Sequence, residues 1–271
     1  MPAEITSRKN EEVRSYLQLS GSASFRRETH CFSAEGARLC SDAAASNVKI
    51  FTLFSTVSAS EKYGSYLAEI RKVCGKEYTV SPSVAEYMAQ TKNPQGVFCV
   101  CGMPENPSNF PETEGGKHML LLENMQDPAN VGAVFRTAEA LGIGGVLLCG
   151  NCCDAFSPKV LRASMGAVFR LPLYRREDAP ETVRALNDSG FQTLAAVPDA
   201  TAQKITSLFF ENPCTAVIGN EGNGLTEATK SACSLRVTIP MLGRAESLNA
   251  AASAAILMWE MMRGKSKGGR S

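Results

Sequence analysis

The second half of the chain alternates continuous apolar runs of strand length with segments of helical periodicity, and this alternation limits the possible folds more than any other feature. Strands are predicted at residues 118–125, 144–149, 167–173, 191–197, 214–219 and 235–241. Helices are predicted at residues 130–142, 157–165, 179–190, 225–233 and 247–264. Apolar strands separated by helices predict an α/β fold with a parallel sheet that helices cover on both faces.

Polar clusters follow three of these predicted strands. They are Asn130–Arg136 after the first strand, Gly219–Leu225 after the fifth and Ser247–Asn249 after the sixth. Ligands of open parallel sheets bind outside the carboxyl ends of the strands. The sequence therefore predicts one site that three loops build at a single edge of the sheet.

The second cluster lies in the glycine-rich stretch VIGNEGNGL, residues 217–225. It has neither the G-x-G-x-x-G spacing of dinucleotide-binding loops nor the Gly-Lys-Ser/Thr ending of NTPase phosphate loops. The carboxylate of Glu221, at its centre, would repel a phosphate group. This loop is therefore not expected to bind phosphate.

A segment rich in proline and glycine, residues 102–117, is predicted to be a linker. Before it, residues 1–101 mix helix-like and strand-like segments, as in a small α/β domain. Arg26 and Arg27 stand beside Phe25 in this part of the chain. A basic pair beside an aromatic residue is the combination that contacts unpaired RNA, although a solvated surface would show the same pattern.

Charge and apolar content point to an ordinary globular protein. The 271 residues carry a formal net charge of +1, which predicts no global attraction to nucleic acid. No apolar stretch reaches the roughly 18–20 residues of a membrane span, and the N-terminus lacks the apolar core of a secretory signal. We therefore expect a cytoplasmic protein without a membrane partner.

The ten cysteines and two histidines do not follow a metal-binding pattern. Cys149 and Cys152 form a C-x-x-C, but a zinc site needs a second pair of ligands. His30 and His118 are isolated from each other in the sequence. Structural thiols and no metal are expected.

Three stretches, DPANVGAVFRTAEALG, VIGNEGNGL and IPMLGRAESLNAAASAA, resemble in order and spacing the signature motifs of the SpoU (TrmH) family. These are RNA ribose 2'-O-methyltransferases of the SPOUT class. Residues 4–100 resemble more loosely the ribosomal-protein-like RNA-binding domain that often precedes the catalytic domain. The resemblance implies an RNA substrate-binding domain at 1–101, a linker at 102–117 and a SPOUT methyltransferase domain at 118–271.

The same resemblance implies a fold and a cofactor. The fold would be a parallel-sheet α/β domain with a trefoil knot, preceded by the small α/β RNA-binding domain. S-adenosylmethionine would lie in the knot, held mainly by the backbone of Gly219, Ile239 and Leu248. The family also implies a homodimer whose active sites use both subunits, with the small residues at 250–255 near the interface.

The resemblance further implies that the catalytic residues are Asn130, Arg136, Glu221, Ser247 and Asn249. Because a guanidinium stays protonated in proteins, Arg136 is expected to bind an RNA phosphate and stabilise the alkoxide that develops nearby. Glu221 is expected to pair with Arg136 or to bind substrate hydroxyls. Asn130 and Ser247 also stand where helix N-caps are expected.

Methylation of ribosomal RNA is the leading expectation, because an RNA-binding-like domain precedes the catalytic one. Methylation of transfer RNA and a catalytically silent RNA-binding protein on the same fold are the alternatives. A nucleotide-dependent oxidoreductase would show the same alternation of strands and helices. That class is excluded because residues 124–136, after the first strand, contain a single glycine and no fingerprint.

Overall fold

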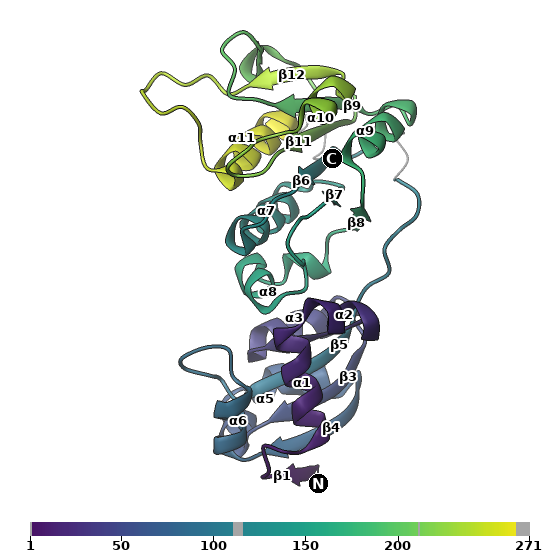
Figure 1. Ribbon diagram of the computed structural model, residues 1–271. Coiled ribbons are helices and arrows are strands. Elements are labelled where there is room, and N and C mark those ends of the chain that lie inside the picture. The colour runs from purple at the N-terminus through teal and green to yellow at the C-terminus, as the bar shows by residue number, and fades with distance from the viewer. Residues whose placement is uncertain (1, 111–115, 211, 264–271) are drawn as a thin grey trace, which may run out of the picture. The chain divides into compact units, whose positions relative to one another are not determined.

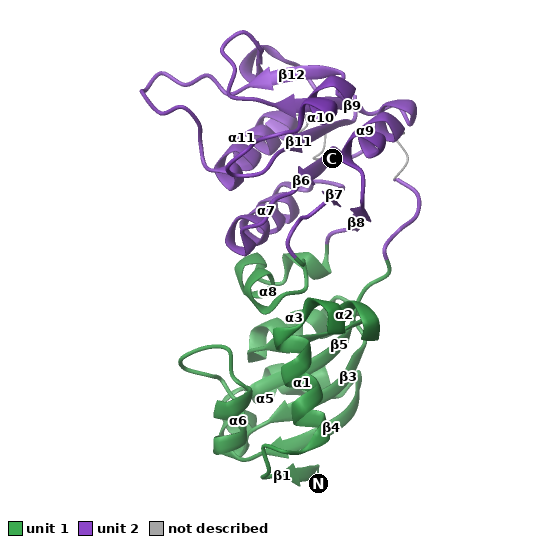
Figure 2. Cartoon of the chain, in the orientation of Figure 1, with its two compact units in different colours: residues 1–105, 154–170 green, residues 106–153, 171–271 purple. Residues whose placement is uncertain are grey.

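The computed structural model describes residues 2–110, 116–210 and 212–263. The chain forms two compact units (Figures 1 and 2). Unit 1 comprises residues 1–105 and 154–170, and unit 2 comprises residues 106–153 and 171–271. Residues 154–170 therefore pack with the N-terminal unit, although the sequence places them between the first and second signature motifs.

Unit 2 contains a seven-stranded sheet in which every pair of neighbouring strands is parallel. Its order is β10-β12-β9-β11-β6-β7-β8. The strands are β6 (Met119–Glu123), β7 (Gly145–Cys149), β8 (Leu173–Arg176), β9 (Gln192–Ala196), β10 (Gln203–Lys204), β11 (Cys214–Ile218) and β12 (Leu235–Thr238). The predicted parallel sheet is confirmed. From β6 the chain adds β7 and β8 on one side and the later strands on the other, so the strand order reverses between β6 and β11 although these two strands are parallel.

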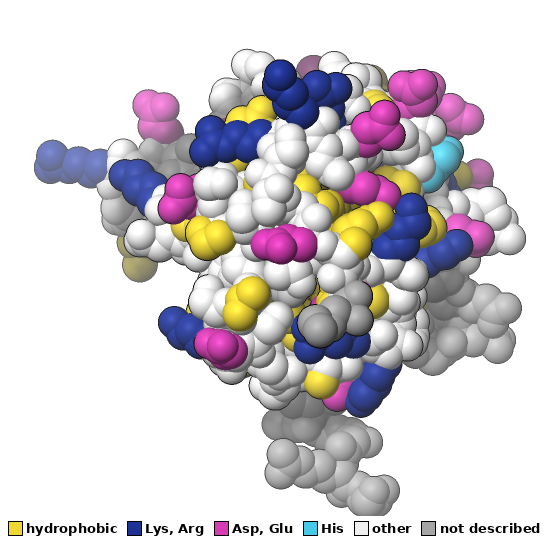
Figure 3. Space-filling model, turned by 90° about the horizontal axis from the view of Figure 1, so that it is seen from below, with side chains coloured by type: hydrophobic (Ala, Val, Ile, Leu, Met, Phe, Trp, Pro, Cys, Tyr) yellow, Lys and Arg dark blue, Asp and Glu magenta, His cyan; other side chains and the backbone are white. Residues whose placement is uncertain are grey.

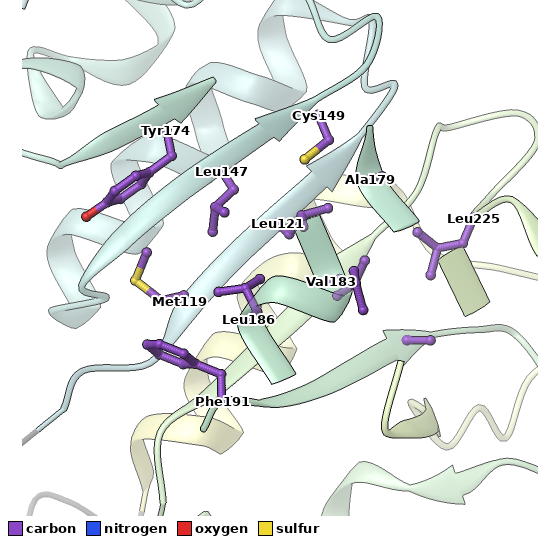
Figure 4. Packing of buried hydrophobic residues seen from close by; sticks show 12 residues of the cluster. Met119, Leu121, Leu147, Cys149, Tyr174, Ala179, Val183, Leu186, Phe191 and Leu225 are labelled. Carbon is purple, nitrogen blue, oxygen red and sulfur yellow. The ribbon is translucent and has the colours of Figure 1, made fainter. Parts of the chain in front are cut away.

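Both faces of this sheet are covered, since every residue of β6, β7 and β11 is buried. The helices of unit 2 are α7 (Pro128–Leu141), α9 (Ala179–Asp188), α10 (Glu227–Ala232) and α11 (Ala250–Arg263), with a short 3-10 turn at Ile205–Ser207. Val183 and Leu186 of α9 pack against Met119, Leu121 and Leu147 of the sheet (Figure 4). Helices α7 and α11 pack against each other, and α11 contacts β11.

Unit 1 contains a five-stranded mixed sheet of order β1-β4-β3-β5-β2. Its strands are β1 (Ala3–Ile5), β2 (Cys31–Glu35), β3 (Ile50–Ser55), β4 (Cys74–Val80) and β5 (Val97–Gly102), and β5 runs antiparallel to both of its neighbours. Its helices are α1 (Glu11–Gly21), α2 (Ala23–Thr29), α3 (Ala37–Ala45), α4 (Val57–Lys62), α5 (Gly64–Arg71), α6 (Pro82–Met88) and α8 (Pro158–Ser164). The expected small α/β fold of this part of the chain is present.

The strand predicted at residues 167–173 is wrong over most of its length. Ala167–Phe169 forms a 3-10 turn of unit 1, and the strand β8 begins only at Leu173. The ring of Phe169 stacks on Phe32 of β2, with 5.7 Å between centroids. Tertiary packing of this apolar turn thus overrides the strand propensity of its sequence.

Arg26 lies at the centre of the contacts that hold residues 154–170 in unit 1. Its side chain is only 4% exposed, and its Nε donates to Oδ2 of Asp154 at 2.7 Å. Its guanidinium also donates to the carbonyl oxygens of Leu19 and Ser20. An RNA contact by Arg26 is therefore excluded, whereas the neighbouring Arg27 is exposed.

Replacing Arg26 with alanine is expected to lower the free energy of unfolding by roughly 3 kcal/mol, because it leaves the largely buried Asp154 carboxylate without its partner. Urea denaturation measures the change. The exposed neighbour supplies a control, since Arg27→Ala should change stability by no more than about 0.5 kcal/mol. Equal effects of the two substitutions would contradict the structural role of Arg26.

The segment predicted as a linker is partly bound to unit 2. The Asn106 side chain accepts from the backbone N–H of Arg175 at 2.8 Å and donates to its carbonyl oxygen at 3.3 Å. Arg176 donates to the carbonyl oxygens of Pro107 and Ser108, and its guanidinium lies 5.4 Å from the ring centroid of Phe110. Residues 106–110 thus pack along the edge strand β8, and residues 111–115 lie outside the described residues.

In the part of the chain that the structure describes, no helix combines the length and apolarity needed to span a bilayer.

Candidate functional site

The three predicted polar clusters meet where the strand order reverses between β6 and β11. The side-chain amide of Asn130 donates to Oε1 of Glu221 at 3.1 Å. The side-chain amide of Asn249 donates to Oδ1 of Asn130 at 3.0 Å. The predicted convergence is confirmed, at the position where open α/β sheets bind their ligands.

Asn130 does not cap helix α7, and that expectation is wrong. The N-cap is Asp127, whose Oδ1 accepts from the N–H of Ala129 at 2.9 Å, and Pro128 begins the helix. Asn130 therefore lies in the first turn, where its side chain is 8% exposed. Freed from capping, its amide is available to join Glu221 and Asn249.

The expected cap of the last helix is also wrong. Helix α11 begins at Ala250, and Oδ1 of Asn249 accepts from the N–H groups of Ala251 and Ala252 at 2.9 and 3.2 Å. Ser247 lies outside the helix and is exposed. Asn249 thus binds the helix end through its oxygen and Asn130 through its nitrogen, so that α11 fixes its orientation.

The Glu221 carboxylate is bound by the loop that follows β6. Its Oε1 accepts from the N–H of Asp127 at 3.2 Å, and its Oε2 accepts from the N–H of Gln126 at 3.4 Å. The expected ion pair with Arg136 is replaced by these amide contacts and by the bond from Asn130. Partial burial alone raises the pKa of Glu221, but these hydrogen bonds outweigh it and hold the pKa below the ordinary value of 4.5. The carboxylate is therefore ionised at neutral pH.

Arg136 lies apart from this cluster. Six residues separate it from Asn130, which places the two side chains about 120° apart around the axis of α7. Its side chain is exposed, and among the described residues none forms a hydrogen bond or ion pair with it. The guanidinium is therefore available to a ligand from outside the chain.

The glycine-rich loop after β11 folds tightly on itself. Asn220 and Gly224 exchange two backbone hydrogen bonds of 3.1 and 2.9 Å, and Oδ1 of Asn220 accepts from the N–H of Gly222 at 2.9 Å. A Cβ on Gly219 would overlap the backbone of Gly224 and Leu225. Only glycine allows this close approach of the two ends of the loop.

A cavity of about 310 Å³ opens between this loop and the segments after β9 and β12. Five of the eight residues predicted for the site line it: Gly219, Glu221, Ile239, Ser247 and Leu248. The other three, Asn130, Arg136 and Asn249, do not. Asn130 and Asn249 reach the cavity only through Glu221, whereas Arg136 has no such connection.

Residues to which the sequence analysis gave no role hold the site loops together. The Asn220 amide donates to the carbonyl oxygen of Asn124 at 2.9 Å, which ties the β11 loop to the β6 loop. Glu123, 3% exposed, accepts from the backbone N–H of Thr226 and from the hydroxyl of Thr229 at 3.0 and 2.6 Å. The sequence did contain a signal for Glu123, which is the acidic residue at the end of an otherwise apolar strand. A carboxylate buried there needs several hydrogen-bond donors, so it predicts contacts with neighbouring loops.

The thiols of the C-x-x-C pair, Cys149 and Cys152, are buried and are expected to be unreactive. Burial raises the pKa of Cys149 to about 12, and burial also raises the pKa of Cys152. The Cys152 sulfur accepts from the N–H of Met125 at 3.3 Å. Within the described ranges, no group of three His, Cys, Asp or Glu side chains is arranged to hold a metal ion.

Cys149 is expected to resist alkylation by iodoacetamide at about pH 8, because only the thiolate reacts and the thiol stays protonated. Because the folded protein keeps this thiol protonated, its effect on the free energy of unfolding is most favourable below pH 9. That free energy falls as the pH rises from 9 toward 12, where the thiol ionises more readily in the unfolded chain. Peptide mass spectrometry with and without urea measures the labelling. Equal labelling of Cys149 in the folded and unfolded protein would contradict its burial.

Comparison with protein families gives two matches. Residues 117–259, just over half of the chain, match the SpoU rRNA methylase family. Residues 10–99 match the MRM3-like substrate-binding domain. The 23S rRNA (guanosine(2553)-2'-O)-methyltransferase RlmP of Bacillus subtilis is 31% identical over 95% of this chain and 98% of its own length.

Solved structures show the same relationship. The AdoMet-bound rRNA methyltransferase from Sinorhizobium meliloti superimposes with a TM-score of 0.86 at 30% identity, covering 96% of this chain and 97% of its own. The SpoU methyltransferase AviRb from Streptomyces viridochromogenes, in complex with AdoMet, superimposes with a TM-score of 0.83 at 26% identity, covering 97% and 100%. With the motifs, the parallel sheet and the site loops in place, the chain belongs to the SpoU rRNA methylase family.

Proposed function

We propose that this protein transfers a methyl group from S-adenosylmethionine to a ribose 2'-hydroxyl in RNA. The observation that carries the proposal is the hydrogen-bonded chain of Glu221, Asn130 and Asn249, which joins all three signature motifs beside the cavity. Membership of the SpoU family supports the same reaction, as does the 2'-O-methyltransferase activity named for the Bacillus subtilis relative.

The cavity fits the cofactor that both solved relatives contain. Its volume of about 310 Å³ suits a ligand of this size, because small-molecule sites span roughly 300–1,000 Å³. We assign cofactor binding to Gly219, Ile239 and Leu248. Gly219 exposes its backbone to the cavity, and Ile239 and Leu248 add apolar side chains to its lining. When bound, the cofactor supplies a methyl group that its sulfonium has already activated.

The chain's own task is then to position the hydroxyl and to favour loss of its proton. Glu221 is ionised and lines the cavity, so that its carboxylate can accept a hydrogen bond from a ribose hydroxyl. Asn130 donates to that carboxylate, and Asn249 in turn donates to Asn130 and so fixes its amide. The exposed Ser247, also at the cavity wall, offers a hydroxyl that can contact the ribose.

Arg136 is assigned to the substrate and not to the cofactor. Its exposed guanidinium can bind a phosphate through two parallel N–H donors, which fixes the nucleotide and stabilises negative charge on the reacting oxygen. It cannot serve as the general base, because a guanidinium stays protonated in proteins.

The proposed substrate is ribosomal RNA. Residues 10–99 match a substrate-binding domain, and both relatives above with a named RNA substrate act on ribosomal RNA. On the face shown in Figure 3, lysine and arginine side chains alternate with acidic ones, in keeping with the net charge of +1. Recognition of the RNA is therefore expected to depend on a few specific contacts by individual side chains and not on a continuous positively charged surface.

We also propose the trefoil knot, the homodimer and a cytoplasmic location that the family resemblance implies. Support for the dimer comes from α11, where Trp259 is 58% exposed and Ile256 is 37% exposed. Two large apolar side chains left exposed on a helix that is otherwise packed against α7 and β11 favour an interface. Arg136 has no partner among the described residues, and in a dimer it could contribute to the active site of the second subunit.

Incubation with methyl-labelled S-adenosylmethionine and total RNA, followed by separation of the RNA by size, tests the substrate. Label in ribosomal RNA is the expected result. Label confined to transfer RNA would contradict the substrate while retaining the reaction. Binding of the cofactor without any transfer would instead favour a silent RNA-binding protein.

A further inference from the structure

Glu123 is a buried carboxylate to which the proposed reaction gives no role. It is the last residue of β6 and is only 3% exposed, and among the described residues none forms an ion pair with it. A buried charge without a counter-ion costs free energy unless several donors satisfy it. Its Oε2 accepts from the N–H of Thr226 at 3.0 Å, and its Oε1 accepts from the hydroxyls of Thr226 and Thr229 at 2.8 and 2.6 Å. All of these donors belong to the N-cap and the first turn of α10.

Helix α10 does not need Glu123 in order to begin. Thr226 caps it with its own hydroxyl, which accepts from the N–H of Thr229 at 3.3 Å. The bonds from Glu123 therefore do something other than cap the helix, because they tie its start to the end of β6.

These bonds fix the far end of the glycine-rich loop, residues 219–225. The near end of the loop follows Ile218 of β11, which pairs with Leu122 of the neighbouring strand β6 (Figure 1). The far end leads into Thr226, which Glu123 holds. Because Leu122 and Glu123 are consecutive in β6, the two ends of the loop are attached only about 3.3 Å apart along one strand.

The loop that is closed in this way lines the cofactor cavity along its whole length. All of its residues contribute to the lining, whereas Glu123, Thr226 and Thr229 do not. Glu123 can therefore affect a ligand only through the loop. A Cβ on Gly219 would already overlap the backbone at the other end, so the shape of the loop depends closely on the separation of its ends.

We propose that Glu123 is a positioning residue for the cofactor, which sets the affinity for S-adenosylmethionine by holding the two ends of loop 219–225 together. Loss of the carboxylate leaves buried donors unsatisfied, and the far end of the loop can then move away from β6. Leu225 stays in the same hydrophobic cluster as Val183 (Figure 4), so the loop loosens while unit 2 remains folded. The inference rests on the proposed binding of the cofactor in this cavity and adds to it a residue that does not touch the cofactor.

Glu123→Gln in the full chain tests the proposal. Glutamine keeps the volume of the side chain, but its NH2 group must face a donor that a carboxylate oxygen now satisfies. The affinity for S-adenosylmethionine, measured by isothermal titration, should fall about 30-fold. The rate of methyl transfer at saturating cofactor should stay within about 3-fold of the wild type, because Glu221 keeps its bonds to Asp127 and Asn130.

Glu35→Gln is the matched control for a general loss of stability. Glu35 is the last residue of β2 in unit 1, does not line the cavity, and accepts from the same two kinds of donor. These are the N–H of Gln90 at 2.8 Å and the hydroxyl of Thr91 at 2.6 Å. Both substitutions should lower the urea midpoint, but only Glu123→Gln should weaken cofactor binding. An equal loss of affinity in the two variants would overturn the positioning role.

Two variants of Thr229 separate the hydrogen bond from the packing of a fully buried side chain. Thr229→Val keeps the shape and removes the hydroxyl that donates to Glu123, so it should weaken cofactor binding about 5-fold. Thr229→Ser keeps the hydroxyl and should bind the cofactor within about 2-fold of the wild type. Normal affinity in Glu123→Gln, or equal affinities of the two Thr229 variants, would contradict the proposal.

The positioning role and the proposed reaction fail in distinguishable ways. Methyl transfer by the wild type, with no effect of Glu123→Gln on cofactor affinity, would remove the positioning role and leave the reaction. A wild type that binds the cofactor but transfers no methyl group, together with weakened binding in Glu123→Gln, would support the role and contradict the reaction. A wild type that does not bind S-adenosylmethionine would overturn both.

Discussion

Arg136→Ala is expected to lower the rate of methyl transfer to RNA about 1,000-fold while changing cofactor affinity less than about 2-fold. The side chain is exposed, does not line the cavity and has no bond to the Glu221 cluster, so its removal should not disturb the cofactor site. What is lost is the charge that fixes the substrate phosphate and stabilises the developing alkoxide. Single-turnover kinetics and cofactor titration separate the two effects.

Two further substitutions define the role of this arginine. Arg136→Lys keeps the charge but loses the planar fork, and it should recover only part of the rate. Arg184→Ala, which removes an exposed arginine from α9, should transfer methyl at the wild-type rate. Near-normal transfer by Arg136→Ala would overturn the assignment, and so would a parallel loss of cofactor binding.

Gly219→Ala is expected to weaken S-adenosylmethionine binding by about 100-fold, or roughly 2.7 kcal/mol. The added methyl group would overlap the backbone of Gly224 and Leu225, so the loop can accept it only by opening. Opening would displace the cavity wall that Gly219 and Glu221 form. Isothermal titration measures the affinity, and the urea midpoint shows whether the damage stays local.

Gly222 provides the matched control three residues away in the same loop. A Cβ there would meet only Oδ1 of Asn220, at 3.5 Å, which is an ordinary van der Waals distance. Gly222→Ala should therefore bind the cofactor within about 3-fold of the wild type. If the two substitutions had equal effects, the close approach at Gly219 would not be what shapes the site.

The sequence was sufficient for the sheet and for the meeting of the three clusters, because both follow from local patterns. Strands such as β6 and β11 are buried on both faces and read as continuous apolar runs, and parallel strands bring their carboxyl ends to one edge. Residues 167–169 could not be predicted in this way. Their apolar sequence suits a strand, and only packing against Phe32, more than 130 positions earlier, makes them a 3-10 turn.

The residue types of the site could be predicted from the sequence, but the hydrogen-bond partner of each residue could not. Asn130 and Asp127 are both good N-cap residues, and the choice between them depends on Pro128, which begins the helix at that position. The partner of Glu221 was missed because backbone N–H groups leave no trace in sequence. The turn-forming Asn220 was visible in the N-E-G-N-G pattern, but its bond to the Asn124 carbonyl required the fold.

The position of the transferred methyl group tests the central claim most directly. RNA methylated in vitro with labelled S-adenosylmethionine is hydrolysed in alkali, which cleaves only where a free 2'-hydroxyl can attack the adjoining phosphate. Ribose methylation predicts that the label remains in alkali-resistant dinucleotides, and that the Arg136→Ala protein gives almost none. Label recovered in mononucleotides would show methylation of a base and would contradict the proposed reaction.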